Sequence, residues 1–217
     1  MNWTAAALLQ RFCVYGRYYS ARFGDRQFNL RSHLEIFEHG LSWPEVATSD
    51  ADLVAIMMNP GASRPLAPTD VDGWGPAMPD RTQYQLMKLA MHAQSQGIAL
   101  RHIRVVNLSD LRTPKSAELF AVLPTLTDDH HSLFSEHRRA ELKRALGAPG
   151  VPVLRAWGLA VALTDLARMG VESTASRKVL GLTDNLLHYR HPLPQRSDLQ
   201  RAWLGQLGRQ IERLVLV

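Results

Sequence analysis

The chain has 217 residues, of which 46% are hydrophobic and 21% are charged, and this composition is typical of one globular domain rather than of a disordered chain. A single cysteine, Cys13, excludes an internal disulfide and any four-cysteine metal or iron–sulfur site. Lys and Arg number 25 against 20 Asp and Glu, a basic balance that is compatible with a nucleic-acid or nucleotide partner but does not establish one.

The N-terminal segment MNWTAAALLQRF has no basic residue before its apolar run, and the apolar stretches of the chain are too short to span a bilayer. We therefore expect a cytoplasmic protein with no membrane partner. We also expect a single α/β domain over 1–217, with an N-terminal helical extension over 1–50, and no cofactor. The oligomeric state is left open.

Short apolar runs alternate with longer helical patterns along the rest of the chain. Four runs predict strands, over 53–58, 103–106, 151–155 and 186–189. Apolar side chains at helical spacing predict helices over 82–96 and 159–169, a half-exposed helix near 132–146, and a last helix that begins at Ser197. Helical connections between the strands favour a three-layer αβα fold with a mainly parallel four-stranded sheet.

Amides, glycines and a histidine follow the predicted strands. In chain order they are Asn59-Pro60-Gly61, Asn107, Trp157-Gly158 and His191. Taken singly, each segment is an ordinary turn or packing feature. Because ligands of open parallel α/β sheets bind beyond the carboxyl ends of the strands, we expect these residues to meet in one pocket.

The loop over 62–81 is long and rich in Pro, Gly and Asp, which is typical of functional lids and of disordered loops. Its Asp72 and Asp80 can face the pocket together with Thr82. Asp80 equally fits the N-cap of the helix that follows, and we favour the cap.

Two polar clusters also have a functional and an ordinary interpretation. Thr127-Asp128-Asp129-His130-His131, with His137 nearby, carries metal-ligand atoms, but neighbours in sequence point apart on regular elements, so we expect a helix-capping segment and no metal site. The basic run over 138–144 can face DNA, and we favour a solvated helix face.

The order of these segments resembles the uracil-DNA glycosylase superfamily. IMMNPGAS, VVNLSDLRTP, VPVLRAWGLAVA and LLHYRHPLP are similar to its four strand-end motifs, over roughly residues 50–215. NPGAS, a later Asp-x-Thr, VVNL, WG and HPL more closely resemble a bacterial domain family of unknown function related to that fold. The resemblance implies a DNA-repair hydrolase that cleaves the N-glycosidic bond of a base in DNA or in a nucleotide.

The resemblance also implies residue roles. Asn59 would position the attacking water and His191 would stabilise the departing base, as the catalytic pair. Asn107 would read the base edge. The other substrate-binding positions are Pro60, Gly61 and Gly158, the phosphate-contacting Arg112 and Arg190, and Leu193 as a wedge in the base stack.

Two departures from the superfamily pattern favour an alternative. The last loop lacks the usual serine after His191-Pro192, and an amide stands at position 59 where a stronger catalyst would carry an aspartate. An amide orients water but cannot take its proton. The alternative is therefore a non-catalytic protein that binds nucleic acid or a nucleotide in the same pocket.

Overall fold

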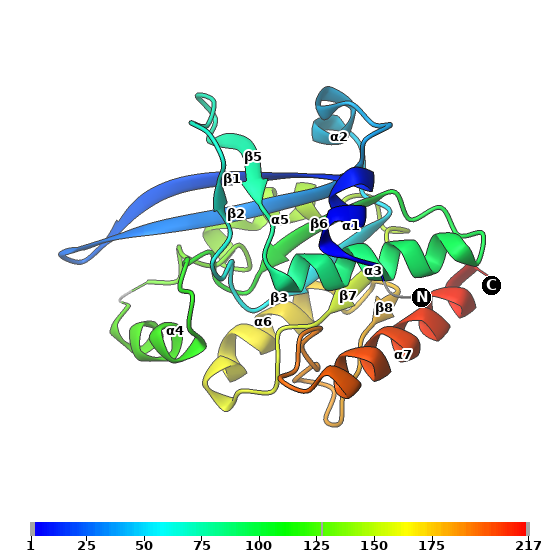
Figure 1. Cartoon of the computed structure of the whole chain (residues 1–217). Helices are drawn as coiled ribbons and strands as arrows, with labels where there is room; N and C mark the ends of the chain where they lie inside the picture. Colours follow the sequence, from blue (N-terminus) through cyan, green and yellow to red (C-terminus); the bar gives the residue numbers. More distant parts are fainter. Residues whose placement is uncertain (1–2, 127, 216–217) are drawn as a thin grey trace.

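The computed structural model describes residues 3–126 and 128–215, and it has the α/β fold that the sequence predicts. Its centre is an eight-stranded mixed sheet in the order β4-β5-β1-β2-β6-β3-β7-β8 (Figure 1). Three neighbouring pairs are parallel, namely β6 with β3, β3 with β7 and β7 with β8. The other four pairs are antiparallel, so the predicted mainly parallel four-stranded sheet is wrong.

The N-terminal region is a hairpin rather than the predicted helical extension. Over residues 3–50 the structure has two short helices, α1 (Ala5–Arg11) and α2 (Trp43–Thr48), and between them lie β1 (Phe12–Phe23) and β2 (Arg26–Glu38). Side chains of β1 alternate between buried and partly buried over its first eight residues, the period of a strand. The tip of this hairpin projects from the body of the molecule in Figure 1.

Three of the four predicted strands are confirmed and form the parallel part of the sheet. They are β3 (Leu53–Met57), β6 (His102–Asn107) and β7 (Val153–Arg155). The fourth prediction is wrong, because β8 lies at Val179–Leu180 and residues 186–189 form a loop. In that loop Leu186 has a φ of 61°, which an extended strand does not allow.

Helices cover both faces of the parallel strands. On one face α1, α3 (Arg81–Ser95) and α7 (Ser197–Val215) pack against one hydrophobic cluster, and α5 (Arg139–Leu146) and α6 (Thr164–Ser173) pack against a second cluster on the other face. Strand β3 supplies both clusters: Leu53, Ala55 and Met57 belong to the first, and Val54 and Ile56 to the second. The predicted helices are thus confirmed, with α5 and α6 beginning several residues later than expected.

The remaining elements are short. The loop over 62–81 contains β4 (Arg64–Pro65) and β5 (Trp74–Met78), and β5 pairs with β1, so much of this loop belongs to the sheet. Helix α4 (Ser116–Val122) packs through Leu119 against Phe23 and Leu30, in the half of the hairpin nearest its turn. Turns of 3-10 helix occupy Leu123–Thr125, Glu136–Arg138 and Val161–Leu163. Within the described ranges, no helix is both long and apolar enough to cross a membrane.

Candidate functional site

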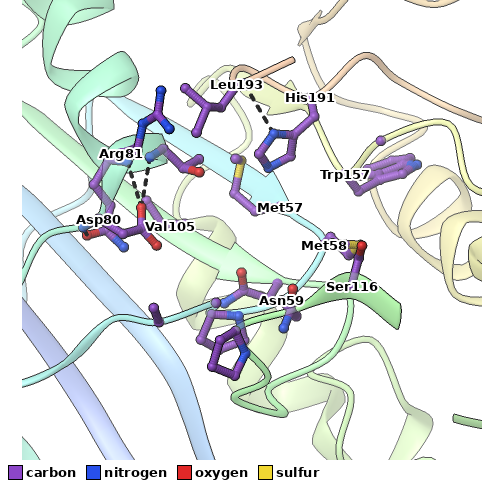
Figure 2. A pocket seen from close by; sticks show the side chains of 18 of the residues that line it. Met57, Met58, Asn59, Asp80, Arg81, Val105, Ser116, Trp157, His191 and Leu193 are labelled. Carbon is purple, nitrogen blue, oxygen red and sulfur yellow. Dashed lines mark hydrogen bonds between the residues drawn. The ribbon is translucent and has the colours of Figure 1, made fainter. Parts of the chain in front are cut away.

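One pocket of about 730 Å³ lies at the carboxyl ends of β3, β6 and β7 (Figure 2), and we call it the strand-end pocket. Its lining includes seven of the nine predicted site residues. They are Asn59, Pro60, Gly61, Asn107, Gly158, His191 and Leu193. The first three follow β3, Asn107 ends β6, Gly158 follows β7, and the last two come from the loop before α7. The volume is in the range of small-molecule sites.

Arg112 and Arg190, the predicted phosphate contacts, do not line the strand-end pocket. The Arg112 Nε donates to the Ser63 carbonyl at 3.0 Å, and its guanidinium stacks over the Tyr18 ring. The Arg190 Nη2 donates to both carboxylate oxygens of Asp184, at 3.0 and 2.9 Å. Both arginines are therefore engaged within the protein.

The Asn59 side chain is fixed in one orientation. Its amide nitrogen donates to the carbonyl oxygens of Leu111 and Thr113 and to the Thr113 hydroxyl, at 2.9–3.1 Å. Carbonyl oxygens only accept hydrogen bonds, so the group that faces them is the NH2 and not the oxygen. The Asn59 Oδ1 accepts no hydrogen bond from the described residues, which leaves it available to a ligand or a water molecule.

The backbone favours glycine at two positions of the pocket wall. Gly61 and Gly158 have φ values of +62° and +102°, in the region that side chains rarely adopt. A Cβ at position 61 would also lie 3.2 Å from the Asp80 Oδ2. The absence of a side chain at Gly61 thus lets the Asp80 carboxylate lie against the loop that carries Asn59.

Asn107 is a fully buried residue of the pocket lining, and its amide is unsatisfied. Its side chain has 0% exposure, and neither its Nδ2 nor its Oδ1 has a hydrogen-bond partner among the described residues. An unpaired buried polar group costs about 1–3 kcal/mol, so such groups are rare and need an explanation. A ligand with a matching donor and acceptor would supply one.

His191 presents one ring nitrogen to the pocket. Its Nδ1 accepts a hydrogen bond from the Leu193 backbone N–H at 3.2 Å (Figure 2), which places the proton of a neutral imidazole on Nε2. Burial lowers the pKa of His191 below its usual value, so the neutral form is favoured. Met57 lies in the middle of the view in Figure 2, with His191 on one side and Asn59 on the other.

Asp80 has the capping role that the sequence favours. Its Oδ1 accepts from the backbone N–H groups of Thr82 and Gln83 at 2.9 and 3.1 Å, and Gln83 completes the capping box at the start of α3. Asp80 and Thr82 also line the pocket, whereas Asp72 lies elsewhere, beside the hairpin. The two interpretations of Asp80 are thus compatible.

Arg31 lines the strand-end pocket and was not found from the sequence. It lies in the middle of β2, in the segment that was expected to be helical, and pairs with Tyr18 of β1. The signal that could have found it is the alternating pattern on either side of Gly24-Asp25, since two such runs around a Gly-Asp turn predict a hairpin.

The two polar clusters lie apart from the pocket. Asp129, His130 and His137 have ligand atoms within 4.8 Å of one another, although both histidines are exposed. In the basic run, Arg138 is largely buried and bonded to Asp110 and Glu141, so the expectation of a solvated helix face is wrong at this position. Position 127 lies outside the described residues.

Comparisons of the chain with family models, with curated proteins and with solved structures found no match. What the strand-end pocket binds must therefore be inferred from its geometry and chemistry.

Proposed function

We propose that the strand-end pocket binds a nucleobase and that the protein hydrolyses the N-glycosidic bond between this base and its sugar. The observation that carries the proposal is the buried Asn107 amide of the pocket lining, whose donor and acceptor have no partner among the described residues. The edge of a nucleobase offers neighbouring acceptor and donor groups that match a carboxamide. Paired in this way, the amide would lose its desolvation penalty on binding.

Neighbouring side chains cover Asn107, so a ligand must move one of them to reach the amide. Because the amide has no exposure in this structure, a base that contacts it must displace part of its cover. Met57 pairs with Asn107 across the β3–β6 ladder, and its side chain lies in the pocket. An unbranched thioether adapts its shape at low cost, so Met57 is the side chain that we expect to move.

His191 and Asn59 support the catalytic part of the proposal. The neutral His191 has its Nε2–H free to donate a hydrogen bond to the departing base, which carries the electron pair of the broken C–N bond. Asn59, with its NH2 group held by Leu111 and Thr113, can accept a hydrogen bond from water through Oδ1 and so orient it toward the sugar. Neither group can take the proton of the attacking water in this arrangement.

Asp80 is the only carboxylate among the described residues of the pocket lining, and it can take that proton. Its Oδ1 caps α3, whereas its Oδ2 has no hydrogen bond within the described chain and lies beside Gly61. In the proposed reaction, water attacks the anomeric carbon as the C–N bond breaks. The proton of the water passes to Asp80, and the base leaves with the bonding pair.

The non-catalytic alternative has one observation in its favour. Position 59 carries an amide whose nitrogen is held by three acceptors, and this group cannot deprotonate water. If Asp80 serves only as a helix cap, the pocket retains base recognition without hydrolysis. This alternative predicts binding of a base with no product.

Base release separates the two functions. Single- and double-stranded oligonucleotides that each contain one uracil, hypoxanthine, xanthine or alkylated purine, together with the matching nucleotides, would be incubated with the protein and analysed for free base by chromatography. We expect release from at least one substrate, with a loss of about 100-fold in His191→Ala, which is a typical contribution of one positioned acid–base group. Arg168→Ala, in an exposed ion pair of α6, is the matched control. Absence of release from every substrate, or full activity in His191→Ala and Asn59→Ala, would contradict the proposal.

A further inference from the structure

Arg31 is a buried cation without a counter-ion. The residue is 1% exposed, and its Nε and Nη1 have no hydrogen-bond partner among the residues that the structure describes. Its side chain lines the strand-end pocket, as does that of His191. Removing a guanidinium from water without a partner is costly, and buried charges are normally paired.

Two other buried arginines of the same sheet show the usual solution. Arg104 donates through Nε to the buried Glu35 at 2.7 Å, and its terminal nitrogens donate to backbone carbonyls. Arg155 donates to Thr174, to the Tyr189 hydroxyl and to the Val171 carbonyl. Arg31 differs from both because its buried Nε and Nη1 have no partner among the described residues, in a side chain that lines a pocket.

Two carboxylates, Asp80 and Asp110, attract the Arg31 cation, but both hydrogen-bond to other groups. Asp80 accepts hydrogen bonds from the start of α3, and Asp110 is bonded to Tyr19 and to Arg138. Within the described ranges, neither of them forms an ion pair with Arg31. The pocket lining therefore contains a cation that Asp80 and Asp110 attract but that forms no ion pair with an acidic side chain of the described protein.

We propose that the ligand of the strand-end pocket is a free nucleotide whose phosphate binds to Arg31, and not a base flipped out of a duplex. This inference rests on the proposed function for the identity of the base. A planar guanidinium binds phosphate oxygens through two parallel hydrogen bonds, donated by Nε with Nη2 or by the two Nη atoms. Each of these pairs includes one of the Arg31 nitrogens that have no partner among the described residues.

The position of the arginines distinguishes a free nucleotide from DNA. A duplex keeps its phosphates outside the pocket, where Arg112 and Arg190 were expected to contact them. Both side chains are instead bonded within the protein, whereas the unpaired Arg31 lies in the interior. An interior cation binds a phosphate that enters the pocket together with its base, as the phosphate of a nucleoside monophosphate would.

Calorimetric titration tests this inference. The probes are the ribonucleoside and deoxyribonucleoside 5′-monophosphates, the matching nucleosides, inorganic phosphate, and a short 5′-phosphorylated oligonucleotide. For the base that binds, we expect the monophosphate to bind about 10- to 100-fold more tightly than its nucleoside, the usual effect of a charged hydrogen-bonded pair. This ratio should fall to about 1 in Arg31→Met, and remain unchanged in the Arg168→Ala control.

The other outcomes have distinct meanings. A ratio near 1 in the native protein, a ratio that persists in Arg31→Met, or equally tight binding of the oligonucleotide would overturn the free-nucleotide inference. If the monophosphate-to-nucleoside ratio is near 1 or does not depend on Arg31, the proposed function still holds provided that the native protein binds a nucleoside and Asn107→Leu does not. Arg31-dependent binding of inorganic phosphate with no binding of any nucleoside would refute the proposed function and support the anion site. If Arg31→Met does not fold, Arg31→Gln carries the same expectation.

Discussion

Replacement of Asn107 by leucine should stabilise the free protein and abolish ligand binding. The two branches of leucine occupy the positions of the Asn107 Nδ2 and Oδ1, which lie buried without partners at the end of β6. The native protein therefore pays the desolvation of an amide in the absence of ligand, and leucine removes this penalty. Most substitutions in a protein core have the opposite effect.

The size of the gain follows from the number of unpaired atoms. A buried polar group that is left unsatisfied costs about 1–3 kcal/mol, and apolar groups of similar shape in its place are neutral to stabilising. Leucine is larger than asparagine, and the pocket beside position 107 can receive part of the added volume. We expect Asn107→Leu to raise the free energy of unfolding by about 1–2 kcal/mol, and the melting temperature by about 2–4 °C for each kcal/mol in a chain of this size.

The same substitution at Asn59 is the matched control. The Asn59 amide nitrogen donates to three acceptors, so Asn59→Leu should lower the free energy of unfolding by about 1–3 kcal/mol. Urea unfolding of both variants, analysed with a common m-value, measures the two changes. Destabilisation of Asn107→Leu to the same extent as Asn59→Leu would show that the Asn107 amide is satisfied in the free protein, and the reasoning would be refuted.

Three further changes test other parts of the structure. Asp80→Asn keeps an N-cap residue and should change the free energy of unfolding by less than about 0.5 kcal/mol, whereas Asp80→Ala should lower it by about 0.5–2 kcal/mol. Both variants should lose the release of free nucleobase. Retained activity in Asp80→Asn would exclude the Asp80 carboxylate as the general base. Burial lowers the pKa of His33 from 6.5 to about 4. Between these pH values the unfolded chain binds a proton that the folded protein does not, so the contribution of neutral His33 to stability is complete above pH 6.5 and is lost as the pH falls toward 4. His33→Gln should therefore remove a fall in the free energy of unfolding on the order of 3 kcal/mol between pH 6.5 and pH 4, measured by urea unfolding. An unchanged pH dependence of the free energy of unfolding would show that His33 does not have this lowered pKa. Glu35→Ala should cost about 3–5 kcal/mol in urea unfolding, because the buried Arg104 and His102 both lose the carboxylate that they contact at 2.7 Å; a cost below about 1 kcal/mol would show that this charge cluster is not stabilising.

The parallel part of the fold was predictable because its strands are buried on both faces. LVAIM and the run before Asn107 read as short apolar segments, and the rule that ligands bind beyond the carboxyl ends of parallel strands led to the residues of the strand-end pocket. That rule depends on the direction of β3, β6 and β7 only. It therefore remained valid although most pairs of the sheet are antiparallel.

The antiparallel part was missed because charged residues occupy buried positions there. Strand β2 carries Arg31, His33 and Glu35 with at most 7% exposure, so its sequence does not read as an apolar run. Glu35 is stabilised by partners on β6 that are 67 and 69 residues away in the chain, and such pairing is invisible to local pattern analysis. Arg31, the strongest single indication of an anionic ligand, lies in the same strand, and the alternation around Gly24-Asp25 was the local signal for the hairpin that carries it.

The false strand over 186–189 has a different cause. LLHY is short and apolar, but Leu186 has a φ of 61°, and Tyr189 forms only isolated bridges, to Gly158 and Thr183. The aromatic ring of Tyr189 packs against the buried Trp157, so the segment is apolar because of side-chain packing and not because of sheet pairing. Periodicity alone does not distinguish a short apolar run that pairs in a sheet from one that is apolar because its side chains pack in the core.

The most direct test of the central claim, that the strand-end pocket recognises a nucleobase through Asn107, is calorimetric titration of the native protein and of Asn107→Leu with the set of nucleoside monophosphates. We predict saturable binding of one molecule per chain by the native protein for at least one base, and loss of this binding in a variant that is folded and at least as stable. Failure of every monophosphate to bind to the native protein, or equal affinity in both proteins, would contradict the claim.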